Sequence, residues 1–138
     1  MKSYRFAAHT SDTRLIAEAG DLESLFQAAL DGMNCLIRQD TCEAAVDLPE
    51  RITISLEADD TSVLLIDFLS EILSYSHLNK CMYCQAKFSV LKETSLAARI
   101  YGIKVDRFDR DVKAVTYHEA EVIRDMEGNY RTVIIFDV

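Results

Sequence analysis

Periodic hydrophobic positions predict two helices of different character. Apolar residues recur every three or four positions from residue 22 to 37, which predicts an amphipathic helix with Asp21 as its N-cap. A second helix is predicted after the capping residues 59–62. Apolar side chains occupy nearly every direction around it, so we expect it to lie centrally. Asp67 and Glu71 are four residues apart within it and share one face, which indicates a solvent-exposed stripe on a mostly buried helix.

Strands are predicted on both sides of these helices. Residues 51–57 alternate between apolar and polar, which is typical of a half-buried strand, whereas the polar segment 39–49 is predicted to be a connection. Further strands are expected at residues 4–8, 14–19, 88–90, 95–101, 112–117, 121–124 and 130–136. This order favours a single α+β domain over residues 1–138, a mostly antiparallel curved β-sheet with two helices packed on it.

Composition and charge narrow the class of function. The chain has 138 residues, which is the size of one domain. Its net charge of −8 opposes direct nucleic-acid binding, which depends on Lys and Arg neutralising phosphates. The longest apolar run, residues 63–66, is far too short to cross a membrane, and no signal peptide precedes it. We therefore expect a cytoplasmic protein with neither a nucleic acid nor a membrane as its direct partner.

The four cysteines are Cys35, Cys42, Cys81 and Cys84. A reducing compartment disfavours a disulfide framework. The lone CxxC at 81–84, with His77 before it, lacks the second pair that a zinc site usually contains. It also follows a predicted helix, whereas a redox CxxC normally opens one. We therefore expect cysteines packed in or near the core.

Acidic oxygens are the best candidates for chemistry. The sequence contains no glycine-rich phosphate loop, no GxSxG elbow and no HExxH motif. A polar turn at residues 9–12 separates two strands, and the apolar final strand is closed by Asp137 and Val138. A terminus held in the sheet would place the Asp137 carboxylate beside the terminal carboxylate, and such anions need a proton or a cation nearby. Oxygen ligands of this kind suit Ca²⁺ or Mg²⁺.

Four blocks along the chain resemble one family. They are His9-Thr10-Ser11-Asp12, the run LLIDFLSEIL at 64–73, the string DVKAVTYH at 111–118, and the hydrophobic ending closed by Asp137-Val138. In type and in order they are similar to the archease family, over essentially the whole chain. The resemblance implies an archease-like fold and a non-enzymatic accessory protein of the tRNA-splicing RNA ligase. That ligase joins 3′-phosphate or 2′,3′-cyclic phosphate ends to 5′-hydroxyl ends. The accessory protein would promote its GTP-dependent guanylylation and support multiple turnover.

The resemblance also implies a divalent metal site. The ion would be Ca²⁺, with Mg²⁺ or Mn²⁺ as alternatives, and its ligands would be Asp12, Asp137 and a main-chain or terminal oxygen of Val138. Lys113 would neutralise carboxylates or contact a phosphate or the partner, unless it is simply a solvent-facing lysine at a sheet edge. His118 and His9 are weaker candidates for such contacts.

The chain departs from the family pattern at several positions. Ser11 stands where alanine is usual, and Thr13 and Arg14 stand where a smaller, more apolar pair is expected. Ile103 follows Gly102 in place of the usual glutamate. Arg14 is expected to pair with Asp12 and to compete with a metal ion.

Two other classes of function remain open from the sequence. The first is a metal-dependent hydrolase or phosphotransferase, in which Asp12 and Asp137 hold the ion and Lys113 or His118 transfers protons. The second is a chaperone-like module with broader clients, whose binding would not depend on the acidic site.

Overall fold

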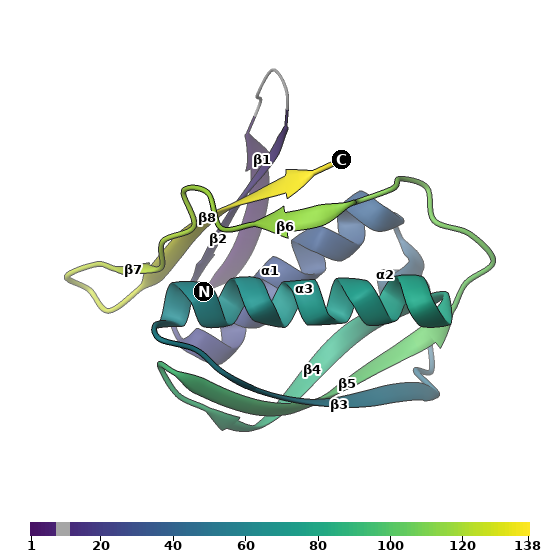
Figure 1. Ribbon diagram of the computed structural model, residues 1–138, viewed down its shortest axis with the longest axis horizontal. Helices are drawn as coiled ribbons and strands as arrows, with labels where there is room; N and C mark the ends of the chain where they lie inside the picture. Colours follow the sequence, from purple (N-terminus) through teal and green to yellow (C-terminus); the bar gives the residue numbers. More distant parts are fainter. Residues whose placement is uncertain (8–11) are drawn as a thin grey trace.

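Two antiparallel sheets with the long helices between them make up the computed structural model, which describes residues 1–7 and 12–138 (Figure 1). The first sheet has the order β1-β2-β8-β6, with β7 also paired to β8. Its strands are β1 (Lys2–Ala7), β2 (Thr13–Ala19), β6 (Ala114–Thr116), β7 (Ile123–Arg124) and β8 (Tyr130–Asp137). The second sheet has the order β3-β5-β4, formed by β3 (Glu50–Glu57), β5 (Ser95–Lys104) and β4 (Cys81–Leu91). The helices are α1 (Leu22–Ile37), α2 (Thr41–Ala44) and α3 (Thr61–Asn79).

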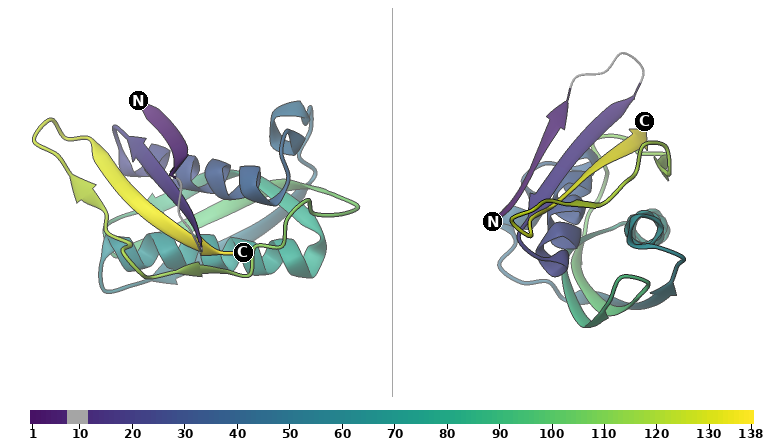
Figure 2. Two further views of the ribbon diagram at one scale, coloured as in Figure 1. Left: turned by 90° about the horizontal axis from the view of Figure 1, so that it is seen from above. Right: turned by 90° about the vertical axis from the view of Figure 1, so that its left-hand side faces the viewer.

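The predicted α+β class is confirmed, with its two principal helices and antiparallel strands. Seen end-on in Figure 2, α1 lies beneath the first sheet, and α3 runs beside it above the second sheet. The strand expected at 112–117 is limited to Ala114–Thr116. Val112 stays outside the ladder because its carbonyl oxygen bonds the His77 ring at 3.1 Å, and Tyr117 leaves it to reach α3.

Helix α1 begins where predicted and packs closely against the first sheet. The Asp21 carboxylate accepts a hydrogen bond from the Ser24 N–H at 2.7 Å, which caps the helix. Gly32 weakens the helix intrinsically, yet a Cβ there would lie 2.6 Å from the Leu15 side chain on β2. Glycine therefore allows the helix to approach the strand.

Helix α3 is buried on most sides, as its all-round apolar pattern predicts. Its buried residues are Leu64, Leu65, Ile66, Phe68, Leu69, Ile72, Leu73 and Ser76. Asp67 and Glu71 are half-buried on the remaining face, and the hydroxyl of Tyr117 donates a hydrogen bond to Asp67. The polar stripe is thus partly covered by the segment that follows β6.

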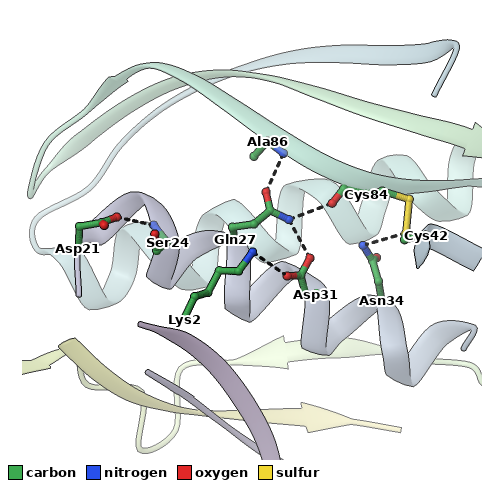
Figure 3. A network of polar contacts seen from close by, with 9 residues as sticks. All are labelled: Lys2, Asp21, Ser24, Gln27, Asp31, Asn34, Cys42, Cys84 and Ala86. Atoms are coloured by element: carbon green, nitrogen blue, oxygen red, sulfur yellow. Dashed lines mark hydrogen bonds and ion pairs between the residues drawn. A yellow bond between two sulfur atoms is a disulfide. The ribbon is translucent and has the colours of Figure 1, made fainter. Parts of the chain in front are cut away.

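Side chains of α1 satisfy the backbone of β4 where its pairing is irregular. The β4–β5 register shifts between Tyr83 and Gln85. Gln27 donates to the Cys84 carbonyl and accepts from the Ala86 N–H, both at 2.9 Å (Figure 3). Asn34 donates to the Tyr83 carbonyl at 2.8 Å. These amide groups satisfy backbone groups of β4, which is an edge strand of the second sheet.

The cysteine prediction is wrong for one pair, because Cys42 and Cys84 form a disulfide with a Cα–Cα distance of 5.5 Å. The two residues are 42 positions apart, so no local pattern reveals the pairing, and only the fold brings α2 against β4 (Figure 3). Cys81 and Cys84 are buried, as expected, and Cys35 is a half-buried free thiol.

In the described part of the chain, no helix is long and apolar enough to span a membrane.

Candidate functional site

Three strand ends meet where the chain terminates. Strand β8 lies between β2 and β6, so the expected anchoring of the C-terminal strand in the sheet is confirmed. In the antiparallel ladders Thr13 faces Phe136, and Ala114 faces Asp137. Because antiparallel registers advance in opposite directions, Asp12 would face Asp137 if the register continued one residue beyond the Thr13–Phe136 pair.

The pleat of the sheet gives the two aspartates a common face. Phe136 is fully buried, whereas Asp137 is exposed, so the Asp137 side chain lies on the face away from the core. Asp12 and Arg14 flank Thr13, the partner of Phe136, and therefore share that outer face. Two of the three predicted metal ligands, together with Arg14, thus belong to one edge and one face of the sheet.

Arg14 lies between two carboxylates at this edge. Its Nε atom is 3.9 Å from Asp12 Oδ1, and its Nη1 atom donates a hydrogen bond to Glu119. The side chains of Arg14 and Asp12 are only 23% and 24% exposed, so little solvent screens their attraction. The pairing of Arg14 with Asp12 that the sequence predicted is confirmed.

Sequence reasoning missed Glu119. It is 105 residues from Arg14 and lies in the turn after β6, where its φ of 58° is in the left-handed region. A non-glycine residue in that conformation indicates a backbone held by its surroundings. No signal in the sequence linked this turn to β2, since only the β2–β8–β6 order brings them together.

The oxygen atoms available at this end of the sheet are of the type that a hard cation such as Ca²⁺ prefers. Asp12 and Asp137 offer carboxylate oxygens, and Val138, which is 41% exposed, offers main-chain oxygens. Within residues 1–7 and 12–138 there is no group of three His, Cys, Asp or Glu side chains suited to a metal ion. An ion here would therefore need the Val138 oxygen or water to complete its coordination, and would compete with the Arg14 guanidinium.

The other predicted contact residues are placed differently. The Lys113 N–H donates a hydrogen bond to the Asp137 carbonyl oxygen at 2.7 Å, so the Lys113 backbone extends the pairing of β6 with the end of β8. Its ammonium group is exposed and forms no ion pair within the described part of the chain. His118 is exposed in the turn beyond β6, and His9 lies outside the described residues, as does Ser11.

A second contact holds the segment after β6 in place. The Tyr117 hydroxyl donates to the Asp67 carboxylate on α3, although the tyrosine is 59% exposed. This hydrogen bond raises the pKa of Tyr117, because losing the proton would leave two facing anions. The contact links the second and third motif blocks, and sequence reasoning did not anticipate it.

Comparison with known proteins identifies the family. The model of the archease protein family matches residues 4–138. The chain belongs to the archease family. It is 28% identical to protein archease of Methanosarcina barkeri, over 99% of this chain and 97% of that protein. The solution structure of Methanobacterium thermoautotrophicum protein 1598 superposes with a TM-score of 0.73 at 27% identity, covering 98% of both chains.

A more distant archease structure shares the fold. The crystal structure of a Thermotoga maritima archease, described as a possible chaperone, gives a TM-score of 0.66 at 17% identity. It covers 94% of this chain and 93% of its own. The match of the archease family model to residues 4–138 confirms the resemblance drawn from the four motif blocks.

Proposed function

We propose that this member of the archease family is a non-enzymatic accessory protein of the tRNA-splicing RNA ligase. It promotes GTP-dependent guanylylation of the ligase and its multiple turnover during joining of 3′-phosphate and 5′-hydroxyl ends. One observation carries the proposal: the archease family model matches residues 4–138. The β2–β8 register supports it, because the terminal pair Thr13–Phe136 lies directly beside Asp12 and Asp137, which close the first and last motif blocks.

The residues at this edge have separable roles under the proposal. The β2–β8 ladder ends at the Thr13–Phe136 pair, next to both aspartates, and the Lys113 N–H donates to the Asp137 carbonyl. A bound divalent cation, Ca²⁺ or alternatively Mg²⁺ or Mn²⁺, would balance these carboxylates and present positive charge to the partner. Arg14 lowers the affinity for that ion by competing at Asp12, and Glu119 holds Arg14 in place.

The charge of the whole chain supports a ligase as the partner. An RNA ligase needs a basic surface to bind phosphates. A chain of net charge −8 is attracted to such a surface without binding RNA itself. We therefore expect a direct protein contact with the ligase and no direct nucleic-acid or membrane contact.

Multiple-turnover RNA joining by the cognate ligase tests this proposal. Asp12→Asn and Asp137→Asn remove charge at constant size, and Asp47→Asn removes an exposed charge outside the edge. We expect the wild type and Asp47→Asn to sustain turnover, while the two edge variants lose most of the stimulation. Equal stimulation by all four proteins would show that Asp12, Asp137 and the chain end (the acidic edge) have no role in activation. No stimulation by any of the four would contradict the ligase proposal.

A chaperone-like role is the second candidate, because the Thermotoga maritima relative is described as a possible chaperone. It predicts that the isolated protein suppresses aggregation of unrelated proteins, and that Asp137→Asn does so equally well. A metal-dependent hydrolase would instead show sustained phosphatase or GTPase turnover without any ligase.

A further inference from the structure

A basic pocket of about 280 Å³ lies at the C-terminal end of α3, away from the disulfide and its polar network. Its lining includes four residues that carry or can carry positive charge, His77, Lys80, Arg107 and Arg110, beside the apolar side chain of Phe108. The connection from β5 to β6 supplies most of the wall as it passes the end of the helix (Figure 1).

The backbone around this pocket is fixed by hydrogen bonds. The Lys80 carbonyl accepts from the Val105 N–H at 3.0 Å, and the Ile37 carbonyl accepts from the Asp109 N–H at 2.8 Å. The His77 ring bonds the Val112 carbonyl and meets the Phe108 ring edge-on, with centroids 5.5 Å apart. A pocket held at three points is preformed, so a ligand would lose little binding energy to ordering it.

The lining carries the positive charges of Lys80, Arg107 and Arg110 against the negative charges of Asp106 and Asp111. Arg107 also lies 4.0 Å from the Asp109 carboxylate. Lys80 and Arg110 form no ion pair in the part of the chain that the structure describes. Asp106 also lines the pocket, but Arg38 donates to it at 2.8 Å from outside, which lowers the pKa of Asp106 and balances its charge. Asp111 is the acidic side chain of the lining that opposes an anion.

We propose that this pocket binds the phosphate group of a small phosphorylated ligand of the nucleotide class. Arg110 offers a planar fork that suits two phosphate oxygens, and Lys80 adds a point charge. Phe108 supplies apolar surface for the organic part. The volume is slightly below the roughly 300–1,000 Å³ of typical ligand pockets, so only a small ligand fits. The proposal is independent of the acidic edge and of the ligase.

Direct titration of the full chain with AMP and with adenosine tests the proposal. We expect saturable binding of AMP to one site, at least about tenfold tighter than binding of adenosine, because each charge-assisted phosphate contact is worth about that factor. Equal affinity for the two compounds, or no saturable binding of AMP, would overturn it.

Three variants connect that binding to the pocket. Lys80→Gly is suited to the left-handed φ of 49° at this position and so removes the ammonium without straining the fold. Lys80→Gly and Arg110→Ala should each weaken AMP binding about tenfold, and Asp111→Asn should strengthen it. The control Arg99→Ala removes an exposed arginine on β5 and should change nothing. AMP affinities of Lys80→Gly and Arg110→Ala equal to that of the wild type, with unchanged thermal melting, would overturn the assignment.

Discussion

Arg14 is the residue that most alters the chemistry of the acidic edge. A guanidinium 3.9 Å from the Asp12 carboxylate supplies part of the positive charge that a metal ion would supply. Arg14 is therefore expected to weaken the proposed metal site while leaving the strand ladder intact.

Replacing Arg14 should strengthen metal binding. We expect Arg14→Ala to bind Ca²⁺ about fivefold to tenfold more tightly, because removing a competing charge in a partly buried setting is worth about 1 kcal/mol. Calorimetric titration of the apo protein measures this. Arg5→Ala is the matched control, because the Arg5 guanidinium forms an ion pair with Glu18, 3.5 Å apart, outside the acidic edge. An unchanged or weaker affinity in Arg14→Ala would show that Arg14 does not compete for the site.

Gly102 is required by the close approach of β4 and β5. A Cβ there would lie 2.4 Å from the Met82 carbonyl oxygen, which is backbone and cannot swing aside. We expect Gly102→Ala to lower the free energy of unfolding by about 1–3 kcal/mol, as overpacking does. Gly20→Ala is the control, because the nearest atoms would be 3.8 Å away. Equal urea midpoints for the two variants would contradict this reading.

The sequence could suggest only those residues of the candidate site that belong to a motif block or to the chain terminus. Asp12 and Asp137 are candidates because each closes a motif block, and each directly follows or precedes the last residue pair of the β2–β8 ladder, Thr13–Phe136. Glu119 could not be found, because its role depends on a pairing across 105 residues. An ion pair between residues far apart in the chain leaves no local sequence pattern, whereas an amphipathic helix leaves a periodic one.

At the level of elements, α2 depends on its covalent link. None of its four residues is buried, and Cys42 joins it to β4 through the disulfide. Helix propensity alone does not hold so short a helix, so the tether to β4 is what positions this connection.

Reduction of the Cys42–Cys84 disulfide should therefore destabilise the protein. The bond closes a loop across 42 positions, for which the chain-entropy model gives about 4 kcal/mol, and native disulfides typically contribute about 2–4 kcal/mol. Urea unfolding with and without dithiothreitol measures the difference. Cys35→Ser, which alters a free thiol, should keep the full effect, and Cys42→Ser should abolish it. A wild-type midpoint that is indifferent to the reductant would contradict the prediction.

The elements themselves were largely predictable, and their pairing was not. Regular spacing of apolar residues predicted α1, because one buried helix face repeats along the chain. The capping residues and the continuous apolar run predicted α3. The division of strands into two sheets depends on which edges pair, and alternation of side chains says nothing about that. The contact of α2 with β4 was also not predicted, because it joins segments 42 residues apart that share no local sequence pattern.

At the scale of the whole molecule, the net charge of −8 predicts how the protein meets its partner. Long-range attraction to a basic ligase surface should raise the association rate at low salt. We expect that rate to fall about tenfold or more as ionic strength rises from roughly 0.05 M to 0.5 M, because the Debye length shrinks with added salt. Stopped-flow binding measures the rate, and a constant rate across this range would remove steering from the account.

The central claim is that the acidic edge activates the ligase, and single-turnover guanylylation tests it most directly. The rate with GTP and a divalent cation is compared for ligase alone, ligase with the wild-type protein, and ligase with Asp137→Ala. The account predicts acceleration by the wild type that the variant loses while remaining folded. Acceleration by both proteins would contradict the role of the edge, and acceleration by neither would contradict activation of the ligase itself.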